Sequence, residues 1–533
     1  MASFLMNCYV CNLQTNSFPL FETFCQLDEY TVYIIILRLR KLPNALTYST
    51  IQAKVPLSLE REKAKKHKSI AAQKRRCRRV GVVIDMNKSI TFGQSLSVLL
   101  VVFAILFPAL FFGKAEPHMP LLTALVASAV FIRLFGVTWE EMEEGIIKGV
   151  QSAVAPLLIL SLIGILIGVW MMSGTVPTIL YYGISLISPE YFTISALFLT
   201  ILVSTATGSS FTTVSTVGVA LMGVATALGM DPLVTAGAVI SGACFGDKMS
   251  PLSDTTNFSA AVAGVPLMSH VRFMTRTTVP AIVLTAVFFA FQSQPDAVNL
   301  SNIALIQAEL EKHFSLSVFT LLPAVVVIGC SLWRKPILPT LIAGIASGIV
   351  TAAIFQGKHS PLAWLSVMQN GFHGEFSNEI VGSIVNRGGL MSMTWSLSLI
   401  LIALSLGGLL QRSGVFHALF GSLLKRIRHE GGIITMAGSS SILVNGLTGE
   451  QYLSILLPGQ MFRDSFESRG ISRVRLSRTL EDCGTLINPL IPWGVSGAFF
   501  TSTLHVATLD YLPYALFLWL SPLFTFLFAW IRR

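Results

Sequence analysis

The residues from Gly246 to Asn257, GDKMSPLSDTTN, bring Asp247, Lys248 and Asp254 together with a row of hydroxyl and amide groups. The flanking stretches VTAGAVISGACF and FSAAVAGVPLM carry no charge. Carboxylate, hydroxyl and unwound carbonyl oxygens are the hard ligands that a small cation such as Na⁺ accepts in place of water. The stretch therefore predicts half of an ion-binding site at the bilayer midplane.

The surrounding sequence predicts a membrane protein built of helices. Of the 533 residues, 53% are hydrophobic and only 12% are charged, and the mean hydropathy is +0.69. Soluble domains carry roughly 25% charged residues. Apolar runs such as 95–113 and 395–410 are each about long enough to cross a bilayer as a helix. We expect an all-α polytopic membrane protein, and the sequence has no Walker, HExxH or GxSxG pattern that would favour an enzyme.

Acidic residues in the predicted membrane segments are few and clustered. Five of the 27 acidic residues fall there: Asp247, Asp254, Glu450, Glu481 and Asp482. Each charge at bilayer depth costs roughly 2.5–3.5 kcal/mol. Glycines and prolines, among them Pro251 and Pro489, interrupt the helices that carry these acids. Unwound backbone at this depth persists only where it faces protein or a watery cavity, so the breaks and the acids together predict a binding site.

The chain also contains an internal repeat. TGSSFTTVSTVGVALM (207–222) matches TGEQYLSILLPGQMF (448–462) at a shift of 241 residues, from 207 to 448. Asp247 of GDKMSPL falls on Asp482 of EDCGTLINPL. We expect two membrane repeats of inverted topology, 94–292 and 316–530, each with plain helices, a polar-centred re-entrant hairpin and an interrupted helix.

The expected elements of the two repeats follow the same order. In the first repeat they are 94–113, 119–135, 138–150, 151–173, 191–228, 233–265 and 277–292. In the second they are 316–331, 337–355, 362–388, 390–411, 432–460, 477–505 and 511–530. The pieces 176–188 and 415–424 could be extra helices. Five crossings in each repeat would invert the second half relative to the first.

The distribution of basic residues predicts the orientation. In the ten-crossing arrangement the outward loops hold four Lys and Arg residues and the inward segments hold 17. This favours cytoplasmic N- and C-termini under the positive-inside rule. Residues 1–93 hold 15 of the 37 Lys and Arg residues and are expected to be a disordered basic extension, with Met86 as a natural beginning for the membrane protein. The Cys8 and Cys11 pair has no partner pair at zinc spacing.

The candidate ion- and substrate-binding residues lie at the hairpins and interrupted helices. They are Thr207, Ser209, Ser210, Asp247, Ser250, Ser253, Asp254, Thr255, Thr256, Asn257, Thr448, Glu450, Asp482, Thr485 and Asn488. Asp247, Asp254 and Asp482 are the expected ligands of a transported Na⁺. The transported ions are the only small ions required, and no cofactor is expected.

Plainer interpretations exist for several of these residues. Lys248 could form a structural ion pair with the adjacent Asp247, or act as a cation that competes with the transported ion. Glu481 could be solvated near the cytoplasmic end. The TGSS stretch at 207–210 could serve only close helix packing. His270 is expected to be a surface residue rather than a proton relay.

The stretches FGDKMSPLSDTTN, LSRTLEDCGTLINPLIPWGVSGAF and TGEQYLSILLPGQMF resemble the NhaC-type Na⁺/H⁺ antiporter family, and the resemblance runs from about 94 to 530. It implies a bacterial cytoplasmic-membrane exchanger that expels Na⁺ for H⁺. By position it implies roles for Asp247, Ser250, Asp254, Thr255 and Thr256 in the first signature, and for Asp482, Thr485 and Pro489 in the second. The sequence departs from the family pattern at Cys483, Gly494 and 211–216, which leaves the substrate open.

Two functions are therefore expected. The first is a Na⁺/H⁺ antiporter in which Na⁺ and protons compete for the carboxylates while the repeats rock between two faces. The second is a Na⁺- or H⁺-coupled carrier of a small organic anion or amino acid. In that carrier, TGSS and TGEQ would hold a carboxylate at helix N-termini. The expected partners are these solutes and the lipid bilayer, not nucleic acid.

Overall fold

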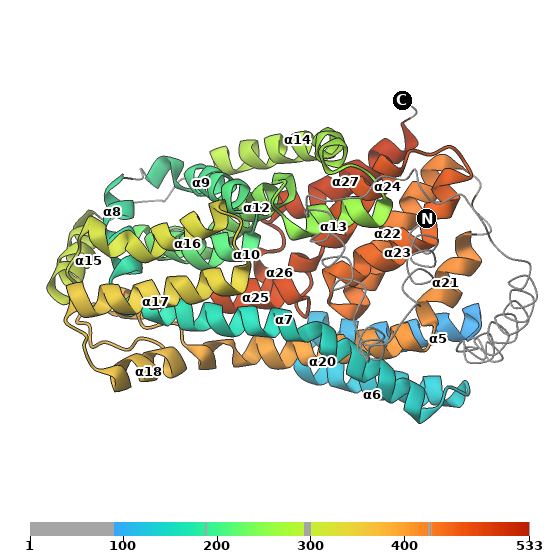
Figure 1. Ribbon diagram of the computed structural model, residues 1–533, viewed down its shortest axis with the longest axis horizontal. Helices are drawn as coiled ribbons and strands as arrows, with labels where there is room; N and C mark the ends of the chain where they lie inside the picture. The colour runs from blue at the N-terminus through green and yellow to red at the C-terminus, as the bar shows by residue number, and fades with distance from the viewer. Residues whose placement is uncertain (1–89, 187–188, 293–299, 425–426, 428, 532–533) are drawn as a thin grey trace, which may run out of the picture. The chain divides into compact units, whose positions relative to one another are not determined.

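The computed structural model describes residues 90–531 except 187–188, 293–299, 425–426 and 428. The chain divides into two units, Met1–Met86 and Asn87–Arg533. The described residues belong to the second unit, so the predictions for 1–89, including those for Cys8 and Cys11, lie outside them. All the elements that the structure describes are helical, with no strand among them (Figure 1).

The number of long apolar helices confirms a polytopic membrane protein. Seven described helices are long and apolar enough to cross a membrane. The number is eight if the bent pair Ala304–His313 and Val318–Leu332 is one span. Shorter apolar helices accompany them. The inverted relation of the two repeats, the ten crossings and the orientation remain predictions.

The first half follows the expected order with one correction. Its helices are α5 (Phe92–Phe107), α6 (His118–Leu134), α7 (Trp139–Met172), α8 (Thr175–Leu186), α9 (Phe192–Thr207), α10 (Ser210–Thr213), α11 (Val219–Leu228), α12 (Pro232–Met249), α13 (Asp254–Ala263) and α14 (Leu267–Phe291). The separate elements expected at 138–150 and 151–173 form one helix, α7. It starts at a capping box on Thr138 and continues through Pro156. The extra helix allowed at 176–188 is present as α8.

The second half begins after the linking helix α15 (Leu300–His313). Its helices are α16 (Leu322–Leu332), α17 (Ile337–Gln356), α18 (Pro361–Asn370), α19 (Glu379–Val385), α20 (Thr394–Arg412), α21 (Val415–Leu424), α22 (Glu430–Thr448), α23 (Gln451–Glu467), α24 (Arg473–Leu480), α25 (Val495–Leu504), α26 (Thr508–Tyr511) and α27 (Leu516–Trp530). The single element expected at 362–388 is two short helices, α18 and α19, because Gly371 ends α18 at a φ of +93°.

Two helix breaks of the same local form lie 241 residues apart. Gly208 ends α9 at a φ of +68°, and Gly449 ends α22 at a φ of +67°. Glycine tolerates this left-handed conformation without strain. The next residue caps the following helix in both cases: the Ser209 side chain accepts from Thr212 N, and the Glu450 side chain accepts from Leu453 N. TGSS and TGEQ therefore encode the same turn.

A second pair of breaks packs against the first pair. Residues 250–253 separate α12 from α13, and a Cβ on Gly208 would meet Leu252 Cβ at 2.6 Å. In the second half, a π-helical turn (Glu481–Thr485) and a 3-10 turn (Asn488–Leu490) separate α24 from α25. Asn488 Nδ2 donates to the Gly449 carbonyl over 2.9 Å. Each glycine break thus packs against the interrupted helix of its own half, and the acids lie at or next to these breaks.

Candidate functional site

Asp247 is held by the TGSS turn between α9 and α10. Its carboxylate accepts hydrogen bonds from Ser210 N over 3.0 Å and from Ser210 Oγ over 2.7 Å. Ser210 opens α10, where unpaired N–H groups favour an anion. The glycine and the serine of TGSS therefore have different structural roles. Gly208 permits close packing against Leu252, and Ser210 donates hydrogen bonds to Asp247.

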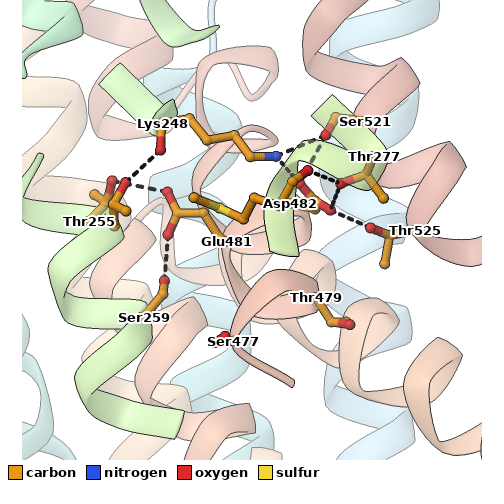
Figure 2. Close-up of polar contacts among 12 residues, drawn as sticks. Lys248, Thr255, Ser259, Thr277, Ser477, Thr479, Glu481, Asp482, Ser521 and Thr525 are labelled. Atoms are coloured by element: carbon orange, nitrogen blue, oxygen red, sulfur yellow. Dashed lines mark hydrogen bonds and ion pairs between the residues drawn. The ribbon is translucent and has the colours of Figure 1, made fainter. Parts of the chain in front are cut away.

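Lys248 forms its ion pair with Asp482, not with the adjacent Asp247. Both side chains are fully buried, and Lys248 Nζ also donates to Ser521 Oγ over 2.9 Å (Figure 2). The expected pairing of Lys248 with Asp247 is therefore wrong. The cause is geometric: successive side chains of a helix point about 100° apart, so α12 directs Asp247 to one neighbour and Lys248 to another.

Asp482 is saturated by donors. Its Oδ1 accepts from Lys248 and, over 2.9 Å, from Ser521 Oγ. Its Oδ2 accepts from Thr277 Oγ1 over 2.9 Å and from Thr525 Oγ1. A transported Na⁺ would have to displace Lys248 to reach this carboxylate. Asp482 therefore differs from Asp247 and Asp254 in having a bound ammonium group.

Glu481 is fully buried, so the prediction that it is solvated is wrong. Its Oε1 accepts from Thr255 Oγ1 over 3.2 Å, and its Oε2 accepts from Ser259 Oγ (Figure 2). Thr255 and Ser259 are four residues apart on one face of α13, as helix geometry requires. A carboxylate of the second half is thereby bound by hydroxyls of the first.

Four acids lie at the helix breaks: Asp247 in α12, Asp254 at the start of α13, Glu450 at the N-cap of α23, and Glu481 in the π-helical turn. The Asp254 side chain is exposed in the protein taken alone. It accepts no hydrogen bond from the residues that the structure describes. We call Asp247, Asp254, Glu450 and Glu481 the acid cluster.

Other predicted ligands satisfy the broken backbone. Thr256 Oγ1 donates to the Lys248 carbonyl over 2.9 Å. Asn257 Nδ2 donates to the carbonyls of Pro251 and Ser253, and Ser250 Oγ accepts from Leu252 N over 3.2 Å. These hydroxyl and amide groups replace the helical bonds lost at the break, and their role as ion ligands stays a prediction.

The second half is organised in the same way. Glu450 caps its own helix α23, and its backbone N–H donates to Thr448 Oγ1 over 3.2 Å. Asn488 joins the two breaks: its Nδ2 donates to Asn445 Oδ1 over 2.7 Å, and its Oδ1 accepts from Ser496 N over 2.7 Å. In contrast, the buried Thr485 hydroxyl has no hydrogen-bond partner among the described residues. Thr207 lies close to Thr213 in the first hairpin, with 3.5 Å between their hydroxyls.

His270 is fully buried in α14, so the prediction of a surface residue is wrong. Its Nδ1 lies 2.8 Å from Ser477 Oγ of α24. Its Nε2 is buried without a hydrogen-bond partner in the described part of the chain. The nearby Arg272 suggested an exposed turn, but α14 packs this face against α24.

Several contributing residues were not predicted as ligands: Glu481, Ser259, Thr277, Ser521 and Thr525. Glu481 had a signal, because an acid beside Asp482 in a broken helix is unusual. The threonines and serines of α14 and α27 had none, since isolated small polar residues are common in membrane helices. Within the described residues, no group of three His, Cys, Asp or Glu side chains has the spacing of a metal site.

A helical membrane protein with acids at interrupted helices has the architecture of a secondary transporter. The chain matches the Na⁺/H⁺ antiporter family over residues 242–531 and belongs to that family. It is 51% identical over 447 residues to the Na⁺/H⁺ antiporter NhaC of Alkalihalophilus pseudofirmus, covering 84% of this chain and 97% of that protein. It is 44% identical to the Na⁺/H⁺ antiporter NhaC of Bacillus subtilis, covering 84% and 100% of the two chains. A malate-2H⁺/Na⁺-lactate antiporter of the same organism is 33% identical, over 76% and 87% of the two chains.

Proposed function

We propose that the chain exchanges Na⁺ for H⁺ across the bacterial cytoplasmic membrane, and that the acid cluster binds both ions. One observation carries the proposal: the cluster contains acids without a base. The nearby ammonium of Lys248 is bound to Asp482, and no described Lys, Arg or His forms an ion pair with Asp247, Asp254, Glu450 or Glu481.

Electrostatics explains why such a cluster would exchange cations. Several carboxylates close together in a low-dielectric site repel one another, and each charge is costly at membrane depth. The cluster is stabilised when a proton or a Na⁺ compensates the charge. Because the two cations neutralise the same groups, binding one favours release of the other, which is the coupling that antiport requires. If the two repeats rock as expected, the helix breaks beside the cluster are the places where the backbone would change conformation.

The hydroxyl groups around the cluster suit a dehydrated cation. Thr255 and Ser259 bind Glu481, and Ser210 binds Asp247. Hydroxyl oxygens can donate to a carboxylate and accept a cation at the same time. We expect Na⁺ and protons to compete for the carboxylates of Asp254, Asp247 and Glu481. In this proposal the protein is a transporter and catalyses no chemical conversion.

The geometry disfavours an organic anion at the hairpin tips. The N-termini proposed for a substrate carboxylate already hold carboxylates of the chain: Asp247 binds Ser210 N, and Glu450 binds Leu453 N. To bind there, a substrate anion would have to displace the Asp247 or Glu450 carboxylate, which has the same charge and belongs to the chain itself. We therefore favour simple cation exchange over coupled transport of an organic acid, although one relative is named for malate and lactate.

The test is transport by purified protein in liposomes that contain a pH-sensitive dye. Na⁺ added against a proton gradient should dissipate the gradient. Lactate, malate or amino acids added without Na⁺ should not. A response that requires one of these solutes in addition to Na⁺ would refute simple exchange and establish the carrier.

A further inference from the structure

We propose that the carboxylate and hydroxyls around Lys248 form a second monovalent-cation site, which the chain fills permanently with its own ammonium group. The site lies between the two halves: α12 supplies the lysine, α14 supplies Thr277, the π-helical turn supplies Asp482, and α27 supplies Ser521 and Thr525 (Figure 2).

The ligands resemble those of an ion site more than those of a simple salt bridge. Ser521 Oγ accepts from Lys248 Nζ over 2.9 Å and donates to Asp482 Oδ1 over 2.9 Å. Its lone pair therefore faces the cation while its proton faces the carboxylate. The ring of Phe517 lies 5.8 Å from the ammonium and adds a cation–π contact. A dehydrated Na⁺ in place of Nζ would meet the Asp482 carboxylate and the Ser521 hydroxyl, while Thr277 and Thr525 hold the second oxygen of that carboxylate.

The position of the site in the repeat supports this assignment. Asp482 aligns in sequence with Asp247, so each half carries an acid at its interrupted helix. Asp247 has hydroxyl and amide donors but no base, whereas Asp482 has Lys248. The lysine therefore makes the two halves unequal. One acid is free to exchange cations, and its counterpart is fixed.

If Lys248 and Asp482 formed only a structural ion pair, Na⁺ would affect the stability of a variant without the lysine differently. Breaking a buried pair leaves an uncompensated charge, which destabilises the protein. If the site binds small cations, the Lys248→Ala variant should bind one Na⁺ in the space of the lost side chain, and this Na⁺ should restore part of the lost stability. If it is only a structural pair, Na⁺ should give the variant no more stability than it gives the wild type.

The experiment measures binding, so its result does not depend on whether the chain exchanges Na⁺ for H⁺. The wild type, Lys248→Ala and Lys248→Met/Asp482→Asn are purified in detergent and titrated with ²²Na⁺ at alkaline pH, where carboxyl groups are ionised. We expect one more bound Na⁺ per chain in Lys248→Ala than in the wild type, and none added in the neutral double variant. Lys148→Ala, which changes an exposed lysine, is the control and should bind as the wild type does.

A variant that folds poorly is tested by thermal unfolding in NaCl, ethylammonium chloride and choline chloride. Binding to the folded state alone raises stability in proportion to the logarithm of cation concentration. Na⁺ and ethylammonium, which fit the vacated space, should raise the melting temperature of Lys248→Ala above its value in bulky choline, by more than in the wild type. An unchanged Na⁺ count, or equal instability in all three salts, would overturn the proposal.

Discussion

The carboxylate of Glu481 accepts a hydrogen bond from the hydroxyl of Ser259, 222 residues earlier in the chain. Glu481 belongs to the interrupted helix of the second half, and Ser259 belongs to α13 of the first. The proposed ion site is therefore assembled from both halves, and a movement of one half relative to the other must change the distances between its ligands. This relation is the basis of the first prediction.

Glu481→Gln should abolish most Na⁺-dependent proton movement while leaving the protein folded, because the amide keeps the shape and can still accept from Ser259. Removing one partner of a buried charge pair costs about 3 kcal/mol or more, which corresponds to roughly a hundredfold loss of Na⁺ affinity. The measurement is the Na⁺ concentration for half-maximal proton release in liposomes. Glu467→Gln, on the exposed end of α23, should retain the wild-type value. Equal values for the two variants would exclude Glu481 from the site.

Asp254→Asn should also eliminate Na⁺/H⁺ exchange, for a different reason. The side chain begins α13 without a hydrogen-bond donor from the described residues, so its charge is available to Na⁺ or a proton. We expect normal insertion and purification, with transport reduced to the background of empty liposomes. Asp464→Asn, an exposed acid away from the cluster, is the control and should transport normally. Wild-type exchange by Asp254→Asn would remove this residue from the mechanism.

Gly208→Ala should destabilise the protein more than Gly229→Ala. Both glycines have left-handed φ angles, +68° and +71°, so both substitutions carry a strain of about 1–2 kcal/mol. A Cβ on Gly208 would also meet Leu252 Cβ at 2.6 Å, whereas nothing lies within 4 Å of a Cβ on Gly229. The crowding should add roughly 1–3 kcal/mol. Thermal unfolding in detergent compares the two variants. Equal melting temperatures would show that the backbone around Gly208 shifts away from Leu252 at no cost in stability.

Asn488→Ala should act on stability and not on Na⁺ selectivity, because Asn488 joins Asn445, Gly449 and Ser496. Its loss leaves Asn445 Oδ1 and Ser496 N without this partner, and each costs about 1–3 kcal/mol, whereas the Gly449 carbonyl still accepts from Val495 N. We expect poor recovery or a markedly lower melting temperature. Asn370→Ala, at the exposed end of α18, should unfold as the wild type does. A stable Asn488→Ala protein with altered cation preference would instead identify Asn488 as an ion ligand.

The sequence was sufficient to predict the helical membrane fold and the breaks beside the acids, but not the continuity of α7 or the break at Gly371. Breaks depend on glycine, proline and local capping, and these are visible within a few residues, as at Gly208 and Gly449. The charges of the GDKMSPLSDTTN stretch were equally visible against an apolar background. The family resemblance is confirmed by the match over residues 242–531.

The partners of the charges could not be predicted in the same way. Adjacency in sequence suggested that Lys248 binds Asp247, but the direction of each side chain depends on which helix packs beside it. Asp482 is 234 residues away from Lys248. The burial of His270 and Glu481 likewise depends on contacts between α13, α14 and α24, which short-range patterns do not specify.

The sequence separation of Lys248 and Asp482 also means that the two partners of this ion pair are synthesised at different times. Ribosomes add about 5–20 residues per second, so the 234 residues between the partners take roughly 12 to 47 s to synthesise. During that time α12 has left the ribosome with a lysine whose counter-charge does not yet exist, at a cost of roughly 2.5–3.5 kcal/mol if it enters the bilayer. The ammonium group of Lys248 therefore has no bound carboxylate until the chain has been synthesised as far as Asp482.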